Sequence, residues 1–129
     1  MRKRLRFLLV LGLAAFGGCG KKSTDELIQD LNSPQDRDRI IAARSLPQRS
    51  GDAARVVPAL IEALKDKDGD VRRSAALGLG SFGEQAKEAI AALQTAQHDR
   101  DARVREAAGI ALARIDPAQF APPSRRRGK

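Results

Sequence analysis

The sequence predicts an all-α protein built as a stack of antiparallel helix pairs. One stretch, residues 71–79 (VRRSAALGL), recurs as residues 104–112 (VREAAGIAL), and the offset from Val71 to Val104 defines a repeat period. The arginine, an alanine and the last leucine keep their places in a copy one period earlier, at Arg39, Ala42 and Leu46. A period of this length marks a repeat array, in which each unit buries its apolar face against its neighbours. Apolar residues recur at helical spacing and no segment alternates at period two, so we expect no sheet.

Residues 1–18 are typical of an export signal. Four cations precede the apolar run 7–16 (FLLVLGLAAF), which is too short for a spanning helix of about 20 apolar residues. Small residues follow, and then comes Cys19, the only cysteine of the chain. This segment resembles a bacterial lipoprotein signal, although Phe16 stands where leucine is usual. We expect a signal peptide over 1–18 and a lipidated Cys19 beginning a short tether over 19–23; ordinary secretion or a retained anchor is the alternative.

The first repeat unit is predicted over residues 24–47. Thr24 can cap its first helix, and acidic residues in the first turn suit the helix dipole. The second helix is expected from Asp36 to Leu46, where Pro47 stops it.

The second unit is predicted over residues 52–82. Pro58 falls inside the apolar pattern of its first helix, so it should kink that helix or lie near its start. An acidic turn leads to the partner helix over 71–79. The following residues 80–83 (GSFG) suit a left-handed cap at a helix C-terminus.

The third unit is predicted over residues 84–116. Its first helix has apolar residues over 86–93, and a turn through His98, longer than the turn of the second unit, leads to a last helix over 102–115. Residues 117–129 have no periodicity and carry four cations near their end, so we predict a disordered basic tail there.

The second helices of units two and three carry a recognisable pattern. Residues 68–80 (DGDVRRSAALGLG) resemble the second helix of a HEAT repeat, and residues 101–108 (DARVREAA) repeat it. The first unit departs by having Asp38 where the others have valine, which an outer unit can tolerate. The resemblance implies a short right-handed α-solenoid of about three HEAT-like antiparallel helix pairs over residues 24–116. It also implies that the second helix of each pair lines the concave face.

Charged residues on these second helices are the candidate contacts. Arg39, Arg72 and Arg105 follow one another at intervals of one repeat period. They can hydrogen-bond turn carbonyls or the acids Asp68 and Asp101, and in HEAT proteins such residues form a ladder between units; direct ligand contact is the alternative. The exposed, partner-binding members of the face are expected to be Arg39, Arg44, Arg72, Arg73, Arg105 and Glu106.

The net charge of +8 belongs to the two ends of the chain. Four of the 24 cations precede Cys19 and four follow residue 124, so the body between them balances 16 cations against 16 acids. A neutral body without Trp or Tyr argues against nucleic acid as the partner.

Three apparent chemical motifs fail on their context. The glycines of 78–83 match G-x-G-x-x-G but follow a helix, whereas a dinucleotide site needs that turn between a strand and a helix. Residues 66–70 (DKDGD) lack the spacing of a calcium loop, and His98 is the only histidine. We therefore predict a protein that is not an enzyme and that uses no metal or cofactor.

The predicted function is protein–protein interaction or scaffolding at the bacterial cell envelope, with a membrane tether at Cys19. Three units are about the minimum for a stable array, so a partner or self-association is expected to cover the outer faces. The alternative is an electrostatic binder of an anionic polymer or membrane surface, which would use the arginine row and the basic tail. A relation to phycobilisome lyases, whose HEAT-like units are similar, is disfavoured by the lack of a second cysteine and the scarcity of aromatic residues.

Overall fold

The computed structural model describes residues 20–122, which form seven α-helices and three 3₁₀ helices and no strand. The all-α class predicted from the repeat is confirmed. The predicted signal peptide, Cys19 and residues 123–129 lie outside the described residues. Within residues 20–122, none of the helices combines the length and the apolar character needed to cross a membrane.

The first unit consists of α1 (Thr24–Asp30) and α2 (Asp36–Ser45). Ser23, not Thr24, caps α1: its hydroxyl accepts a hydrogen bond from the Glu26 amide, and the Glu26 carboxylate accepts one from the Ser23 amide. This reciprocal pair satisfies two amides that a helix N-terminus leaves without partners.

The second unit consists of α3 (Ala53–Ala63) and α4 (Gly69–Ser81), and two 3₁₀ turns, η1 (Leu46–Gln48) and η2 (Ser50–Asp52), lead into it. Pro58 lies inside α3 and not at its start. Gly83 has a φ of +54°, so the left-handed cap predicted after the second helix is confirmed.

The third unit begins with the 3₁₀ helix η3 (Gly83–Ala89), which continues into α5 (Ile90–Ala96) and is followed by α6 (Ala102–Ile115). The longer turn expected at His98 is wrong, because residues 97–101 match residues 64–68 in length. The disorder predicted for residues 117–129 is also wrong for the first residues of this tail. The structure has α7 (Pro117–Phe120) there, because the Asp116 side chain caps it and Phe120 packs on the core.

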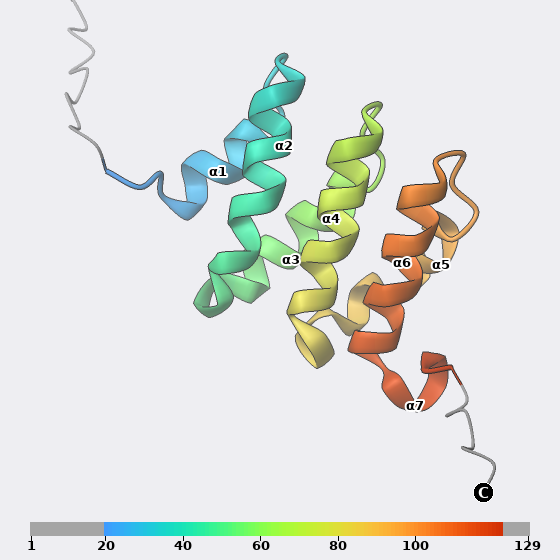
Figure 1. Cartoon of the computed structure of the whole chain (residues 1–129). Coiled ribbons are helices and arrows are strands. Elements are labelled where there is room, and N and C mark those ends of the chain that lie inside the picture. The colour runs from blue at the N-terminus through green and yellow to red at the C-terminus, as the bar shows by residue number, and fades with distance from the viewer. Residues whose placement is uncertain (1–19, 123–129) are drawn as a thin grey trace, which may run out of the picture.

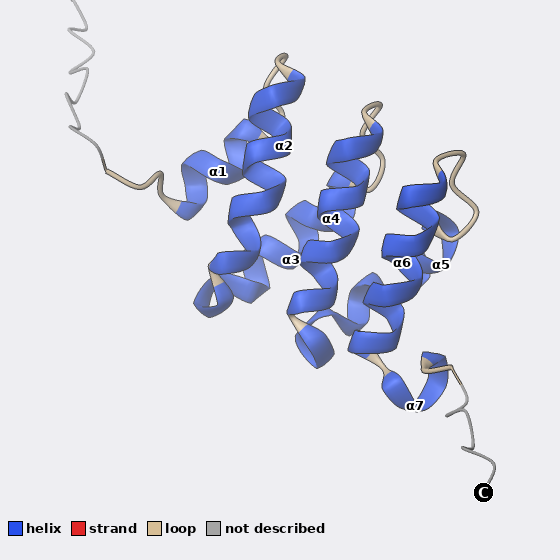
Figure 2. Cartoon of the chain, in the orientation of Figure 1, coloured by secondary structure: helices blue, strands red, loops and turns tan. Residues whose placement is uncertain are grey.

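The helices form two layers (Figure 1). The second-helix row, α2, α4 and α6, lies side by side in front, and the first-helix row, α1, α3 and α5, lies behind it. Figure 2 shows helices joined by short loops, with no strand over the described residues. The arrangement is a short α-solenoid, as the repeat predicted.

The repeated small and apolar residues form the core between the rows. None of the six side chains is exposed at the repeat positions Ala42, Ala75, Ala108, Leu46, Leu79 and Leu112. Small residues let neighbouring units approach closely: a Cβ added to Gly80 would lie 2.9 Å from the Ala111 Cα. The close stack fixes which surface residues of adjacent units become neighbours.

Candidate functional site

Arg39 joins the first unit to the second. Its side chain is buried, with 4% of the residue exposed, and its Nε donates a hydrogen bond to Asp66 Oδ2 at 2.9 Å. One of its terminal nitrogens donates to the Ser33 carbonyl at 2.8 Å. The guanidinium therefore holds both its own turn and the turn of the next unit.

Arg72 makes the equivalent connection from the second unit to the third. Its guanidinium binds Asp99 in a bidentate manner, with distances of 2.8 and 2.9 Å, and also donates to the carbonyls of Asp66 and Lys67. Only 6% of the residue is exposed. The hydrogen bonds from Arg72 lower the pKa of Asp99, although burial acts in the opposite direction, and the same contact raises the pKa of Arg72.

These contacts confirm turn carbonyls as arginine partners but correct the expected acids. The arginines bind Asp66 and Asp99, whereas Asp68 and Asp101 accept amide hydrogen bonds at the N-termini of α4 and α6. We call the pairs Arg39–Asp66 and Arg72–Asp99 the arginine–aspartate ladder.

The ladder also corrects the expected exposure of the candidate face. Arg39 and Arg72 are buried, so they do not lie open to a partner as predicted. Arg105 is exposed; it donates to the carbonyls of Asp99 and Arg100 and forms no ion pair within the described residues. Glu106 is exposed beside it on α6.

Two of the predicted contact residues, Arg44 and Arg73, line the same groove between α2 and α4. This groove has a volume of about 320 Å³. We call it the α2–α4 groove, and its lining residues are Ala43, Arg44, Pro47, Arg73, Ser74, Leu77, Gly78 and Ser81. Neither arginine forms an ion pair or a hydrogen bond with another described residue, so both charges are available to a ligand.

Gly78 of α4 packs closely at the base of the α2–α4 groove, against Pro47 of η1 and Leu60 of α3. A Cβ at Gly78 would lie 2.6 Å from Pro47 Cγ and 3.2 Å from Leu60 Cδ1, so a larger residue has no room there. Buried Ala43 and Ser74 complete the floor, and half-buried Leu77 stands on the α4 side. The groove thus combines small and apolar lining residues with two cations.

Ser74 is a groove residue that the sequence reasoning missed. It is 8% exposed, and its hydroxyl forms no hydrogen bond with another described residue. The signal was present in the repeat alignment: Ser74 occupies the position of Ala107, in a face otherwise made of small and apolar residues. Among the described residues Arg39 Nη2 is the one fully buried side-chain polar atom without a partner, so the Ser74 hydroxyl reaches solvent and can meet water or a ligand group.

The first-helix face of the third unit is more polar than that of the second. Ile61 and Leu64 of α3 line a groove against α5, but Gln94 and Gln97 take their places in the third unit and are exposed. Terminal units of repeat arrays carry such polar faces to stay soluble. The α2–α4 groove is therefore a more specific candidate than this end of the stack.

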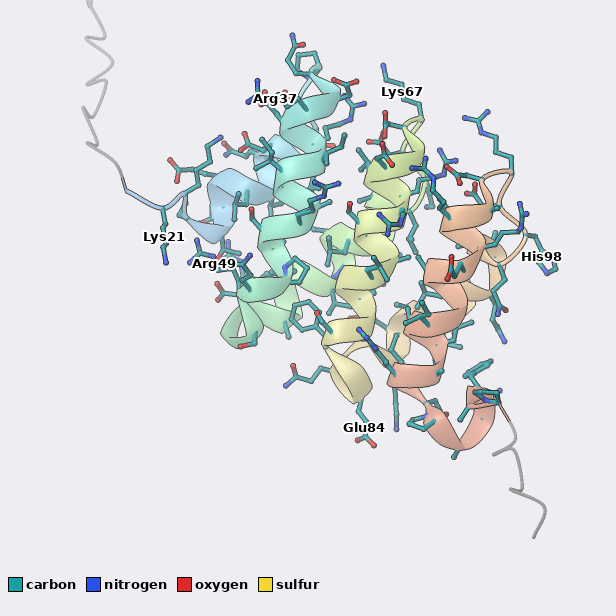
Figure 3. All side chains as sticks on the ribbon, in the orientation of Figure 1. Lys21, Arg37, Arg49, Lys67, Glu84 and His98 are labelled. Carbon is teal, nitrogen blue, oxygen red and sulfur yellow. The ribbon has the colours of Figure 1, made fainter. Side chains whose placement is uncertain are left out.

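The described residues offer no group of side chains that could hold a metal ion. His98 is exposed and projects outward from the turn between α5 and α6 (Figure 3). Lys67 and Glu84 lie beyond opposite ends of α4 in the same view.

The comparisons with known proteins agree with the fold. The family profile described as HEAT repeats matches residues 24–113. A search of curated proteins returns no match. The match covers most of the chain and the same helices that carry the arginine–aspartate ladder, and the chain therefore belongs to the HEAT repeat family.

Proposed function

We propose that the protein is a non-catalytic scaffold that binds a protein partner through the α2–α4 groove. HEAT repeats generally mediate protein–protein interaction, which supports the class of function. The observation that carries the proposal is the pairing of Arg44 and Arg73 in one groove without a neutralising acid. The groove lies on the second-helix row, where partner contacts were expected.

The ladder divides the predicted contact residues by role. Arg39 and Arg72 act within the protein, because both are buried and their guanidinium groups bind turns and aspartates. Arg44 and Arg73 are the main partner contacts. Arg105 and Glu106, both exposed on α6, extend the surface to the third unit.

A charge-reversal experiment tests this function. Arg73→Glu should remove a set of crosslinked proteins that the wild-type protein captures from intact cell envelopes. Lys87→Glu is the matched control, because Lys87 is an exposed cation on η3, in the first-helix row, and forms no ion pair within residues 20–122. Equal capture by all three proteins would contradict the proposed surface.

We also propose that lipid on Cys19 tethers the protein to the bacterial envelope. The support is the sequence pattern of residues 1–19, in which cations, an apolar run and small residues precede the cysteine. Acyl chains on one residue bind membranes firmly, at about 0.8 kcal/mol for each buried methylene. Metabolic labelling with a fatty-acid analogue should mark the wild-type protein and not Cys19→Ser. Labelling of both would contradict a lipid at this cysteine.

A second candidate function is electrostatic binding of an anionic polymer or membrane. The free charges of Arg44 and Arg73 favour it, and the cations of residues 125–129 would add to it. Polyanion binding weakens steeply as salt concentration rises, because binding releases condensed counterions. A protein interface with an apolar centre should weaken much less between low and physiological salt.

A further inference from the structure

We propose that the α2–α4 groove binds an acidic segment of a partner protein, in which a carboxylate is followed by an apolar side chain. This inference rests on the proposed protein-binding function and names the chemistry of the ligand. It draws on three features of the groove: its two cations, the Ser74 hydroxyl and its apolar lining residues.

The charge of the groove favours a carboxylate. Arg44 belongs to α2 and Arg73 to α4, so each helix contributes one cation to the groove. All 16 acidic residues of the chain lie within residues 25–116, and none of them lines the groove. A ligand carboxylate would therefore provide the countercharge that the protein itself does not. Arginine suits this task because its planar fork matches a carboxylate.

The Ser74 hydroxyl adds a donor at the floor of the groove. More than nine-tenths of Ser74 is buried, and its hydroxyl has no hydrogen-bond partner within the described residues. A hydroxyl in this position can donate to a carboxylate held by the two arginines. Because this hydroxyl reaches solvent, it is open to a ligand that enters the groove.

The apolar lining residues select a protein segment over a simple anion. Pro47 and Leu77 both line the groove and are half-buried, and buried Ala43 lines it with them. A phosphate or sulfate group would leave these surfaces in contact with water. An apolar side chain next to the bound carboxylate would cover them, which adds favourable burial.

The neighbouring interface between α4 and α6 shows that this chemistry is confined to one groove. The residues one repeat period further along carry different groups: Leu77 replaces Arg44, Glu106 replaces Arg73, and Ala107 replaces Ser74. The interface between α4 and α6 therefore has an acid, Glu106, where the α2–α4 groove has the cation Arg73, and it has no hydroxyl in the place of Ser74. Glu106 also interrupts the row of cations, which disfavours a polyanion lying along the second helices.

Fluorescence anisotropy on the full-length protein in detergent tests the ligand class. The probe is a short labelled peptide in which aspartate alternates with leucine. Two comparison peptides replace every aspartate by asparagine or every leucine by serine. We expect the aspartate–leucine peptide to bind at least about fivefold more tightly than either one, because each exposed charge pair or small apolar contact contributes about 1 kcal/mol.

Variants of the groove locate the binding. Arg44→Gln and Arg73→Gln should each weaken binding by about fivefold, and Ser74→Ala by about threefold, because each loses one interaction with the carboxylate. Lys87→Gln should bind as the wild type does. Thermal melts by circular dichroism verify that each variant is folded, and Ser74→Ala is expected to melt normally because the repeat already has alanine at residue 107.

Two results would overturn the proposal. One is wild-type affinity in both arginine variants, and the other is equal affinity for the leucine and serine peptides, which would indicate binding of any anion. If the peptides fail while Arg73→Glu still loses crosslinked partners, the ligand class is wrong but the protein-binding function stands. If those partners are also retained, the proposed function fails as well.

Discussion

The guanidinium of Arg72 donates hydrogen bonds to three acceptor groups, one carboxylate and two backbone carbonyls. It binds both oxygens of Asp99 and two turn carbonyls, while only 6% of the residue remains exposed. Removing one partner of a buried ion pair is strongly destabilising, since the other partner keeps its desolvation cost. The ladder arginines therefore act chiefly on stability.

Arg72→Gln should lower the free energy of unfolding by about 3 kcal/mol. Arg105→Gln is the matched control, because Arg105 occupies the same repeat position but is exposed and has no acidic partner within the described residues. It should change stability by less than about 1 kcal/mol. Chemical unfolding followed by circular dichroism measures both, and equal losses would contradict the ladder.

Asp99 should give the protein a specific sensitivity to acid. The hydrogen bonds from Arg72 lower its pKa in the folded state, so protonation favours unfolding. Its contribution is fully present above the unfolded-state pKa of about 4 and is lost as the pH falls through the lower folded-state value. Asp99→Asn should be less stable at neutral pH and lose less stability than the wild type on acidification below about pH 4. Urea unfolding across this range tests the difference, and parallel curves would contradict it.

The acids of the ladder could not be chosen from the sequence. Asp66 and Asp99 are one repeat period apart, but so are Asp68 and Asp101, and both pairs fit the period equally well. Only the turn geometry separates the two pairs. Asp68 and Asp101 cap α4 and α6, whereas Asp66 and Asp99 face the arginines. The burial of Arg72 was missed for a related reason: arginine is rarely buried unless it is paired, and its pairing depends on the next unit.

At the scale of helices, contact between units depends on small residues in the second-helix row. Gly80 faces α6 closely, with no room for a side chain against Ala111. Alanine stabilises a helix by about 1 kcal/mol relative to glycine. For the substitution of Gly80 by alanine, helix propensity therefore predicts a gain in stability, whereas packing predicts a loss. The packing term is the larger because the clash is with backbone, which cannot move aside cheaply.

Gly80→Ala should therefore destabilise the protein by about 1–2 kcal/mol. The control is Gly51→Ala, because no atom lies within 4 Å of an added Cβ there. That change should stay within about 0.5 kcal/mol of the wild type. A thermal melt of Gly80→Ala at or above the wild-type temperature would show that α4 and α6 are less closely packed than described.

The helices themselves were largely predictable from the period and the apolar spacing. Leu46, Leu79 and Leu112 are fully buried as their recurrence indicated. The α2–α4 groove was predictable only in part. Arg44 and Arg73 were predicted as contact residues, but the groove that they share depends on tertiary packing, such as that of Pro47 on Gly78. The short helix after Asp116 was missed because Pro117 reads as a stop, although proline is also favoured at the first position of a helix.

At the scale of the whole molecule, the three units share one hydrophobic core. A single cluster of buried residues extends from Leu27 in α1 to Ile115 in α6. No unit closes its own apolar face, and the ladder crosses both boundaries between units. Stability in such an array comes from the interfaces as much as from the units.

The protein should therefore unfold in one cooperative transition. Helicity followed by circular dichroism and amide protection followed by hydrogen exchange should give coincident midpoints in denaturant, because an isolated unit would lose its packing partner. Arg72→Gln should shift both curves together. Separate transitions for the first and third units would contradict a shared core.

Photo-crosslinking in intact cells tests the central claim, that the α2–α4 groove is where the protein meets its partner. A photoreactive residue at Ser81, exposed at the edge of this groove, is compared with one at Lys87, exposed on the first-helix row. The account predicts crosslinked protein from Ser81, lost when Arg73→Glu is added, and none from Lys87. Crosslinks from Lys87 alone, or crosslinks from Ser81 that survive Arg73→Glu, would contradict it.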